Sequence, residues 1–156
     1  MAIAKFRLPA LLLPAALLLA AAGDTPLRPG LWEIRNTPGV ATLDGQPLDD
    51  LPLGEIRTQK VCLAPAQAAD PAAFFARDTE ADCRIVKAST AGGTAEIDGV
   101  CPNPEEGTEG TLKLSGRYSS DSYELDFATR AEDFQGVMTF SGTLSGRRIG
   151  ACPGPN

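Results

Sequence analysis

The stretch YELDFATRAE, residues 123–132, decides the fold class of this chain. Apolar or small side chains at Tyr123, Leu125 and Phe127 alternate with charged or small ones along the stretch. A period of two is typical of an antiparallel strand with one face buried and the other in water. Similar alternation predicts strands at 94–101, 111–118 and 137–144, and earlier candidate strands lie at 31–37, 55–63 and 83–89.

The connections between these segments are short and rich in turn-forming residues. Gly92-Gly93 joins 83–89 to 94–101, which is typical of a tight hairpin. Ser119-Ser120-Asp121 joins the next pair of strands, and the run at 102–107 is a loop by composition. The sequence therefore predicts a mainly β fold, an antiparallel meander of about seven strands that is curled or partly closed.

The segment 65–77 interrupts the β pattern and predicts one or two short helical pieces. Asp70 and Pro71 form a good N-cap and first-turn pair, so a helix should begin there. Pro71 also prevents one continuous helix through the segment. Phe74 and Phe75 follow, and at least one should cover an open end or face of the sheet. A structural plug is the favoured interpretation, and a ligand-gating lid is the alternative.

The first 22 residues have the three-part order of a cleaved secretory signal peptide. Lys5 and Arg7 precede an uncharged, apolar run that ends in small residues at Ala22. A spanning helix needs about 20 apolar residues, and this shorter run contains two prolines and has no basic stop after it. We expect cleavage between Ala22 and Gly23. Because Gly23 stands where a lipoprotein needs Cys, we expect a soluble, exported product without a membrane anchor.

Residues 23–156 have a normal length for a single β-rich domain. Removal of Lys5 and Arg7 with the signal lowers the formal charge from −6 to −8. A basic patch that could neutralise phosphates is missing from the sequence, so we do not expect a nucleic-acid partner. The acidic balance favours solubility or attraction to a cationic partner.

Four cysteines, all after the signal, predict two disulfides in an oxidising compartment. Four thiols allow three connectivities. The hairpin favours Cys83 with Cys101, because one opens a strand and the other closes its partner, and this leaves Cys62 with Cys152. The second bridge should bring the ends of the sheet together. The alternative is a zinc site, but the chain has neither histidine nor a CxxC pair, so we expect no metal.

The residue types that carry common hydrolytic chemistry are scarce in this chain. Without histidine a Ser–His–Asp or Cys–His arrangement is excluded. Carboxylates cluster in two loops. These are Glu105, Glu106 and Glu109 beside Asn103, and Asp49 and Asp50 within the long Pro/Gly-rich loop expected at 38–54. Paired carboxylates can hydrolyse glycosides only when a cleft fixes their separation, so a solvated surface is favoured over catalysis or weak Ca²⁺ binding.

Two further features of the sequence favour structural roles. Arg147 and Arg148 should lie on opposite faces of a strand end, where a salt bridge is favoured over an anion site. Trp32, the single tryptophan, is expected to anchor the core, with an exposed ligand platform as the alternative.

Several motifs spread along the chain resemble those of a family of small exported proteobacterial proteins, the domain of unknown function 3617 family. They are Pro29-Gly30-Leu31-Trp32-Glu33, Val61-Cys62-Leu63 with Pro65 and 66–71, Phe74-Phe75, Asp82-Cys83, 145–150 and Cys152-Pro153. The resemblance implies export to the periplasm and a β-rich fold. It implies no activity, cofactor or catalytic residue.

The leading hypothesis is a non-enzymatic periplasmic binding or accessory protein of the cell envelope. Its apolar strand faces must pack somewhere, and a curled sheet leaves room for a small apolar ligand or an envelope-protein partner. The alternatives are an inhibitor of an envelope lysozyme or protease and a carboxylate-dependent hydrolase. We expect no cofactor, and the sequence does not identify a ligand.

Overall fold

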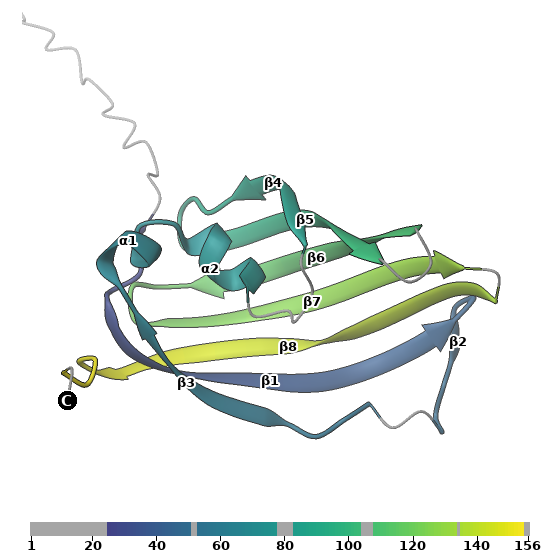
Figure 1. The fold of residues 1–156 in the computed structure, drawn as a ribbon, viewed down its shortest axis with the longest axis horizontal. Helices are drawn as coiled ribbons and strands as arrows, with labels where there is room; N and C mark the ends of the chain where they lie inside the picture. The colour runs from purple at the N-terminus through teal and green to yellow at the C-terminus, as the bar shows by residue number, and fades with distance from the viewer. Residues whose placement is uncertain (1–24, 51–52, 78–82, 104–107, 134, 155–156) are drawn as a thin grey trace, which may run out of the picture.

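The protein is described by a computed structural model for residues 25–50, 53–77, 83–103, 108–133 and 135–154 (Figure 1). These residues form eight strands and two short helices. The elements are β1 (Gly30–Leu43), β2 (Gln46–Pro47), β3 (Arg57–Leu63), α1 (Pro65–Ala68), α2 (Pro71–Arg77), β4 (Arg84–Ser89), β5 (Thr94–Asn103), β6 (Thr108–Tyr118), β7 (Ser122–Asp133) and β8 (Gly136–Gly150). The mainly β, antiparallel fold predicted from the sequence is confirmed.

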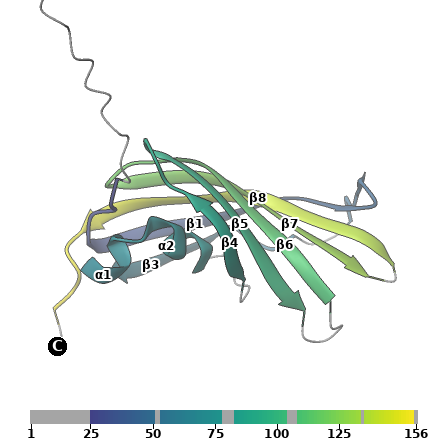
Figure 2. The ribbon, with the colours of Figure 1, turned by 90° about the horizontal axis from the view of Figure 1, so that it is seen from above.

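The strands form one antiparallel sheet that is curved but not closed (Figure 2). Its order is β2-β1-β8-β7-β6-β5-β4, and β3 pairs with the first half of β1. Strands β4 to β8 make the predicted meander, because each pairs with the next in sequence. Strand β1 then pairs with β8, which places the first and the last of the described strands side by side in the sheet.

The prediction of a long loop at 38–54 is wrong for its first part. Strand β1 continues to Leu43, and a register shift between Pro38 and Ala41 marks a β-bulge that accommodates a proline within the strand. The extra residue switches the inward-facing positions from even to odd numbers, so Val40 is 52% exposed and Ala41 only 2%. Asp44 and Gly45 then make a two-residue turn into β2 with positive φ angles of 50° and 79°.

A proline begins each of the two helices. The Asp70 carboxylate accepts a hydrogen bond from the Ala73 amide at 3.0 Å, which caps the first turn of α2. Pro71 occupies the first position of α2, so the predicted break in the helical segment is confirmed. Phe74 and Phe75 are both buried against the sheet.

The core lies between these helices and one end of the inward face of the sheet (Figures 1 and 2). Trp32 is fully buried there, as expected of a core anchor, and its indole N–H donates to the Arg28 carbonyl at 3.0 Å. Five aromatic rings form a continuous cluster: Trp32, Phe74, Phe75, Tyr118 and Tyr123. Around them lie the inward-facing aliphatic residues Ile34, Leu63, Ile97, Leu112, Leu114, Leu125 and Leu144.

The structure pairs Cys83 with Cys101 and Cys62 with Cys152, the two pairs that the hairpin predicts. The Cα atoms are 4.0 Å apart in the first pair and 5.4 Å in the second. The expectation that the second bridge joins the ends of the sheet is wrong. Because β1 pairs with both β3 and β8, Cys62–Cys152 instead links the edge strand β3 to the residues after β8, across the start of β1.

Candidate functional site

Helices α1 and α2 cover only one end of the inward face of the sheet (Figures 1 and 2). Beyond them the face continues along the far halves of β1, β7 and β8. We define the open apolar face as the inward-facing residues Ala41, Leu43, Phe127, Met138 and Phe140. Cross-strand pairing joins Leu43 to Met138 and Ala41 to Phe140. Met138 is 39% exposed and Leu43 and Phe140 are half-buried, whereas Ala41 and Phe127 are buried at the base of this face.

The centre of the open apolar face is a pair of phenylalanines on neighbouring strands. The ring centroids of Phe127 and Phe140 lie 5.6 Å apart. Gly142 lies opposite Phe127 on β8, and an added Cβ there would come within 2.7 Å of the Phe127 ring carbons. A glycine at this position therefore leaves room for the Phe127 ring to pack against β8.

An open pocket of about 530 Å³ lies between the end of α2 and the β3 edge of the sheet. Its floor is apolar, formed by Ile34 and Leu144, and polar side chains surround it: Asn36, Arg57, Thr58, Gln59 and Arg77. Its volume lies within the range of about 300–1,000 Å³ that is typical of sites for small molecules.

This pocket continues toward the open apolar face. A second hollow of about 90 Å³ is lined by Pro38, Leu53 and Phe140, and it shares Asn36 and Arg57 with the first. We call the two hollows together the groove. It runs from Arg77 at the end of α2 along the inward side of β1 and β8 to Phe140, where the open apolar face begins.

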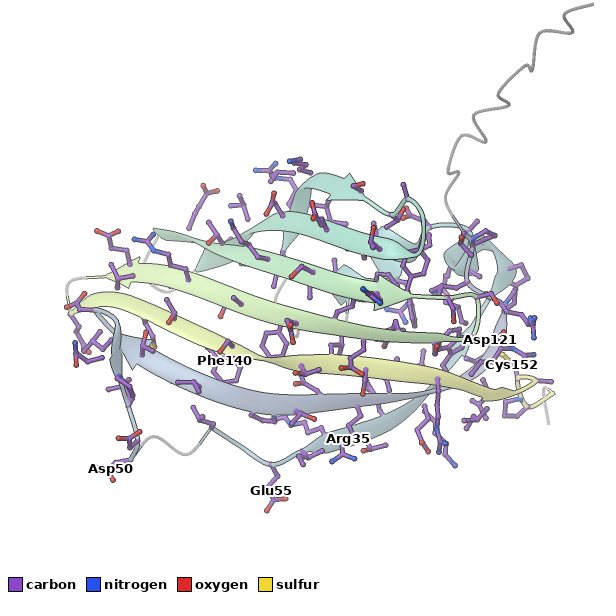
Figure 3. The ribbon with its side chains drawn as sticks, turned by 180° about the vertical axis from the view of Figure 1, so that it is seen from behind. Arg35, Asp50, Glu55, Asp121, Phe140 and Cys152 are labelled. Carbon is purple, nitrogen blue, oxygen red and sulfur yellow. A yellow bond between two sulfur atoms is a disulfide. The ribbon has the colours of Figure 1, made fainter. Side chains whose placement is uncertain are left out.

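The charged side chains of the groove are mainly cationic. Arg57 faces inward on β3, opposite Asn36 of β1, and Arg77 is the last residue of α2. Glu55 is the one carboxylate among the described lining residues, and its side chain points away from the sheet (Figure 3). The polar end of the groove therefore presents guanidinium and amide donors above an apolar floor.

These groove residues were not singled out from the sequence, although a signal for Arg57 existed. Within 57–63 the residues Arg57, Gln59, Val61 and Leu63 alternate with Thr58, Lys60 and Cys62. Because Leu63 is buried, the same period places Arg57 on the inward face. Arg77 could not be found in this way, since its position depends on how α2 packs on the sheet.

The carboxylates considered for catalysis are distributed rather than gathered. Asp49, Asp50 and Glu109 are exposed, and Figure 3 shows Asp50 at the margin of the molecule. Asp49 and Asp50 follow β2, which pairs with β1, whereas Glu109 lies on β6. Strands β8 and β7 lie between β1 and β6 in the sheet, so the two groups of carboxylates are far apart in the strand order. Glu105, Glu106 and the Asn103 side chain lie outside the described residues. Within the described part of the chain, no group of three or more His, Cys, Asp or Glu side chains could hold a metal ion.

The two C-terminal arginines have the separate structural roles expected from alternation. Arg147 lies on the outward face and forms a salt bridge with Glu33 of β1 at 2.7 Å, so the strand-end salt bridge is confirmed. Arg148 lies on the Leu144 face and donates a hydrogen bond to the Pro29 carbonyl at 2.9 Å. Neither residue lines the groove.

The signal peptide at 1–22 and its cleavage site at Ala22 and Gly23 lie outside the described residues. Among the residues that the structure describes, no helix has the length and apolar character needed to cross a membrane.

Comparison with family models shows the family of the chain. Residues 27–152 match a family model described as a protein of unknown function (DUF3617). The chain belongs to the DUF3617 family. The matched region begins just before Trp32 and ends at Cys152, so it contains every described strand, both helices and both disulfides of this DUF3617 protein. Searches of curated proteins and of solved structures give no significant match.

Proposed function

We propose that this DUF3617 protein is a non-enzymatic binding protein of the periplasm that holds an elongated apolar molecule in the groove and on the open apolar face. The observation that carries the proposal is the incomplete cover of the inward face. The helices bury the aromatic cluster, whereas Leu43, Met138 and Phe140 remain partly exposed on the same face. Contiguous exposed apolar surface on a soluble domain favours an interaction site.

The chemistry of the groove supports binding rather than catalysis. Its polar side chains are guanidinium, amide and hydroxyl groups, which orient a ligand by hydrogen bonds. Carboxylate-dependent hydrolysis needs two carboxyl groups facing each other across a cleft, and Glu55 points outward. The periplasmic location is supported by the basic, apolar and small-residue order of 1–22 and by the disulfides, which persist in oxidising compartments.

Binding of a neutral fluorescent probe tests this function. N-phenyl-1-naphthylamine has no charge and fluoresces in apolar surroundings, so the delipidated protein should bind it saturably. Met138→Glu should weaken the probe affinity at least about fivefold, because it places a carboxylate in the contact surface, where burial of an unpaired charge is costly. Val40→Glu is the matched control, since Val40 is an exposed apolar residue on the outward face of the same sheet.

The result distinguishes a small-molecule site from a surface that binds a protein partner. Probe binding that Met138→Glu weakens and Val40→Glu leaves unchanged supports the proposal. Absence of probe binding, together with a clean apo mass for periplasmic protein in native mass spectrometry, would overturn it in favour of a protein partner. Both variants should be compared at equal folded fraction by circular dichroism.

A further inference from the structure

The groove has two chemically different ends, and its polar end carries positive charge. Arg57 and Arg77 both line the larger hollow, together with the amide side chains of Asn36 and Gln59. The smaller hollow shares Asn36 and Arg57 with the larger one. Toward its other end the lining is Pro38, Leu53, Gly54 and Phe140, with Glu55 pointing away from the sheet and the open apolar face beyond. A site of this kind suits an amphiphile, with one charged head and one apolar chain.

We infer that the groove selects amphiphiles with an anionic head, which Arg57 and Arg77 hold while the alkyl chain lies along β1 and β8 toward Met138. This inference rests on the proposed function and names the class of its ligand. A planar guanidinium donates two parallel hydrogen bonds to a carboxylate or a phosphate oxygen pair, which makes arginine well suited to such a head.

The two arginines lie on different secondary-structure elements, so a ligand head bound by both would connect a strand to a helix. Arg57 lies on the edge strand β3, and Arg77 ends α2 with its guanidinium carbon 6.0 Å from the centre of the Phe74 ring. Arg57 also takes part in an interaction within the protein. Five N–H donors per guanidinium allow an internal partner and a ligand to be bound at once.

The dimensions of the groove fit an extended chain. Asn36 marks the polar end and Leu43 the far end of the open apolar face, seven positions later on β1. At the rise of an antiparallel strand, and with one residue taken up by the bulge, this path is roughly 20 Å long. An alkyl chain on this path would contact Phe140 and Met138, the inward residues of β8 along the same line.

The net charge of the protein is negative and would by itself disfavour an anionic ligand, so a preference for an anionic head would have to come from the arginines of the groove. The formal charge is −6 for the full sequence and −8 without Lys5 and Arg7 of the expected signal peptide, so the molecule as a whole attracts cations. An anionic head would therefore be favoured only by local cations. Three ligands with the same chain test this: dodecanoate, dodecan-1-ol and dodecyltrimethylammonium. Isothermal calorimetry is carried out below the critical micelle concentration of the two ionic ligands and below the solubility limit of the alcohol.

Dodecanoate should bind about tenfold more tightly than either of the other two, as expected for two partly exposed charge-assisted contacts. The variant R57Q/R77Q should remove this preference and leave the affinity for dodecan-1-ol within about twofold. R35Q and K60Q are matched controls, because Arg35 and Lys60 are exposed cations on the outward face of the same strand pair. Neither control should change the preference.

The outcomes separate the two proposals. Equal binding of all three ligands would overturn the anionic head and leave the apolar groove standing. A preference for dodecanoate that survives R57Q/R77Q, or that R35Q removes, would overturn the assignment to Arg57 and Arg77. Failure of all three ligands to bind would overturn the proposed function as well. Thermal unfolding of each variant shows whether it is folded, and the single variants R57Q and R77Q provide the same test if the double variant is not.

Discussion

The Trp32 indole stacks on the Tyr123 ring with 5.9 Å between centroids, although β8 separates their strands. Gly146 is the residue of β8 that makes this contact possible. It pairs with Ile34 on one side and with Tyr123 on the other, and the Tyr123 ring lies over its Cα. Aromatic side chains from β1 and β7 thereby form one layer, and Phe74 of α2 packs on both rings.

Substitution of Gly146 by alanine should destabilise the protein. An added Cβ would overlap the Tyr123 ring, so the aromatic layer would have to shift. Overpacking of this kind costs about 1–3 kcal/mol, and urea unfolding monitored by tryptophan fluorescence measures it. Gly150→Ala is the control on the same strand, because nothing lies within 4 Å of an added Cβ there. Equal effects of the two substitutions would contradict this account of the core.

Phe75→Ala should destabilise the protein by about 3–5 kcal/mol, the usual cost of removing a large buried aromatic ring. Phe75 is 0% exposed and contacts both Tyr118 and Tyr123. Ala73→Ser, on the exposed side of the same helix, is the control. A helix that acted as a ligand-gating lid would give a different result, namely unchanged stability and faster entry of the probe.

Removal of the disulfides should have unequal effects. In the chain-entropy model the bridge between Cys83 and Cys101, 18 residues apart, stabilises by about 3 kcal/mol. The bridge between Cys62 and Cys152, 90 residues apart, stabilises by about 4.6 kcal/mol. Paired Cys→Ser variants in urea unfolding should reproduce this order. Non-reducing peptide mapping that joins Cys62 to Cys83 would contradict the pairing itself.

The mature protein recovered from the periplasm should begin at Gly23. This follows from the small residues that end the apolar run at Ala22. Intact mass measurement of the periplasmic fraction gives the cleavage site directly. A mass that includes residues 1–22 would contradict the proposed signal peptide.

Much of the fold follows from local patterns, and the exceptions have physical causes. Alternation identifies four of the strands, the three earlier candidate segments overlap β1, β3 and β4, and Asp70-Pro71 places the start of α2. These signals depend only on neighbouring residues. The continuation of β1 was missed because Pro38 and Gly39 usually end a strand, whereas here a bulge accommodates them. The Asp44-Gly45 pair was a hairpin signal inside the segment interpreted as a loop.

The candidate site was harder to predict than the fold. The pairing of β1 with β8 joins residues about 100 positions apart, as in Ala41 with Phe140. Only this long-range pairing brings the open apolar face together, and only the packing of α2 brings Arg77 to the groove. Sequence alternation indicates which side chains share a face. It does not indicate which part of that face the helices leave uncovered.

Two unique residues allow a direct test of where a ligand lies. Met1 and Met138 are the only methionines, so Met138 is the single one in protein prepared without residues 1–22, and Trp32 is the single tryptophan. Met138 lies on the open apolar face, whereas Trp32 is fully buried beneath the helices. NMR spectra of protein labelled at the methionine methyl and the tryptophan indole thus report on the two halves of the inward face.

Titration of this labelled protein with dodecanoate is the most direct measurement of the central claim. The account predicts a saturable shift of the Met138 methyl resonance, while the Trp32 indole N–H resonance stays nearly constant. A ligand that binds by calorimetry but shifts the Trp32 resonance and leaves Met138 unchanged would contradict it, because the ligand would then occupy the core beneath the helices and not the open apolar face.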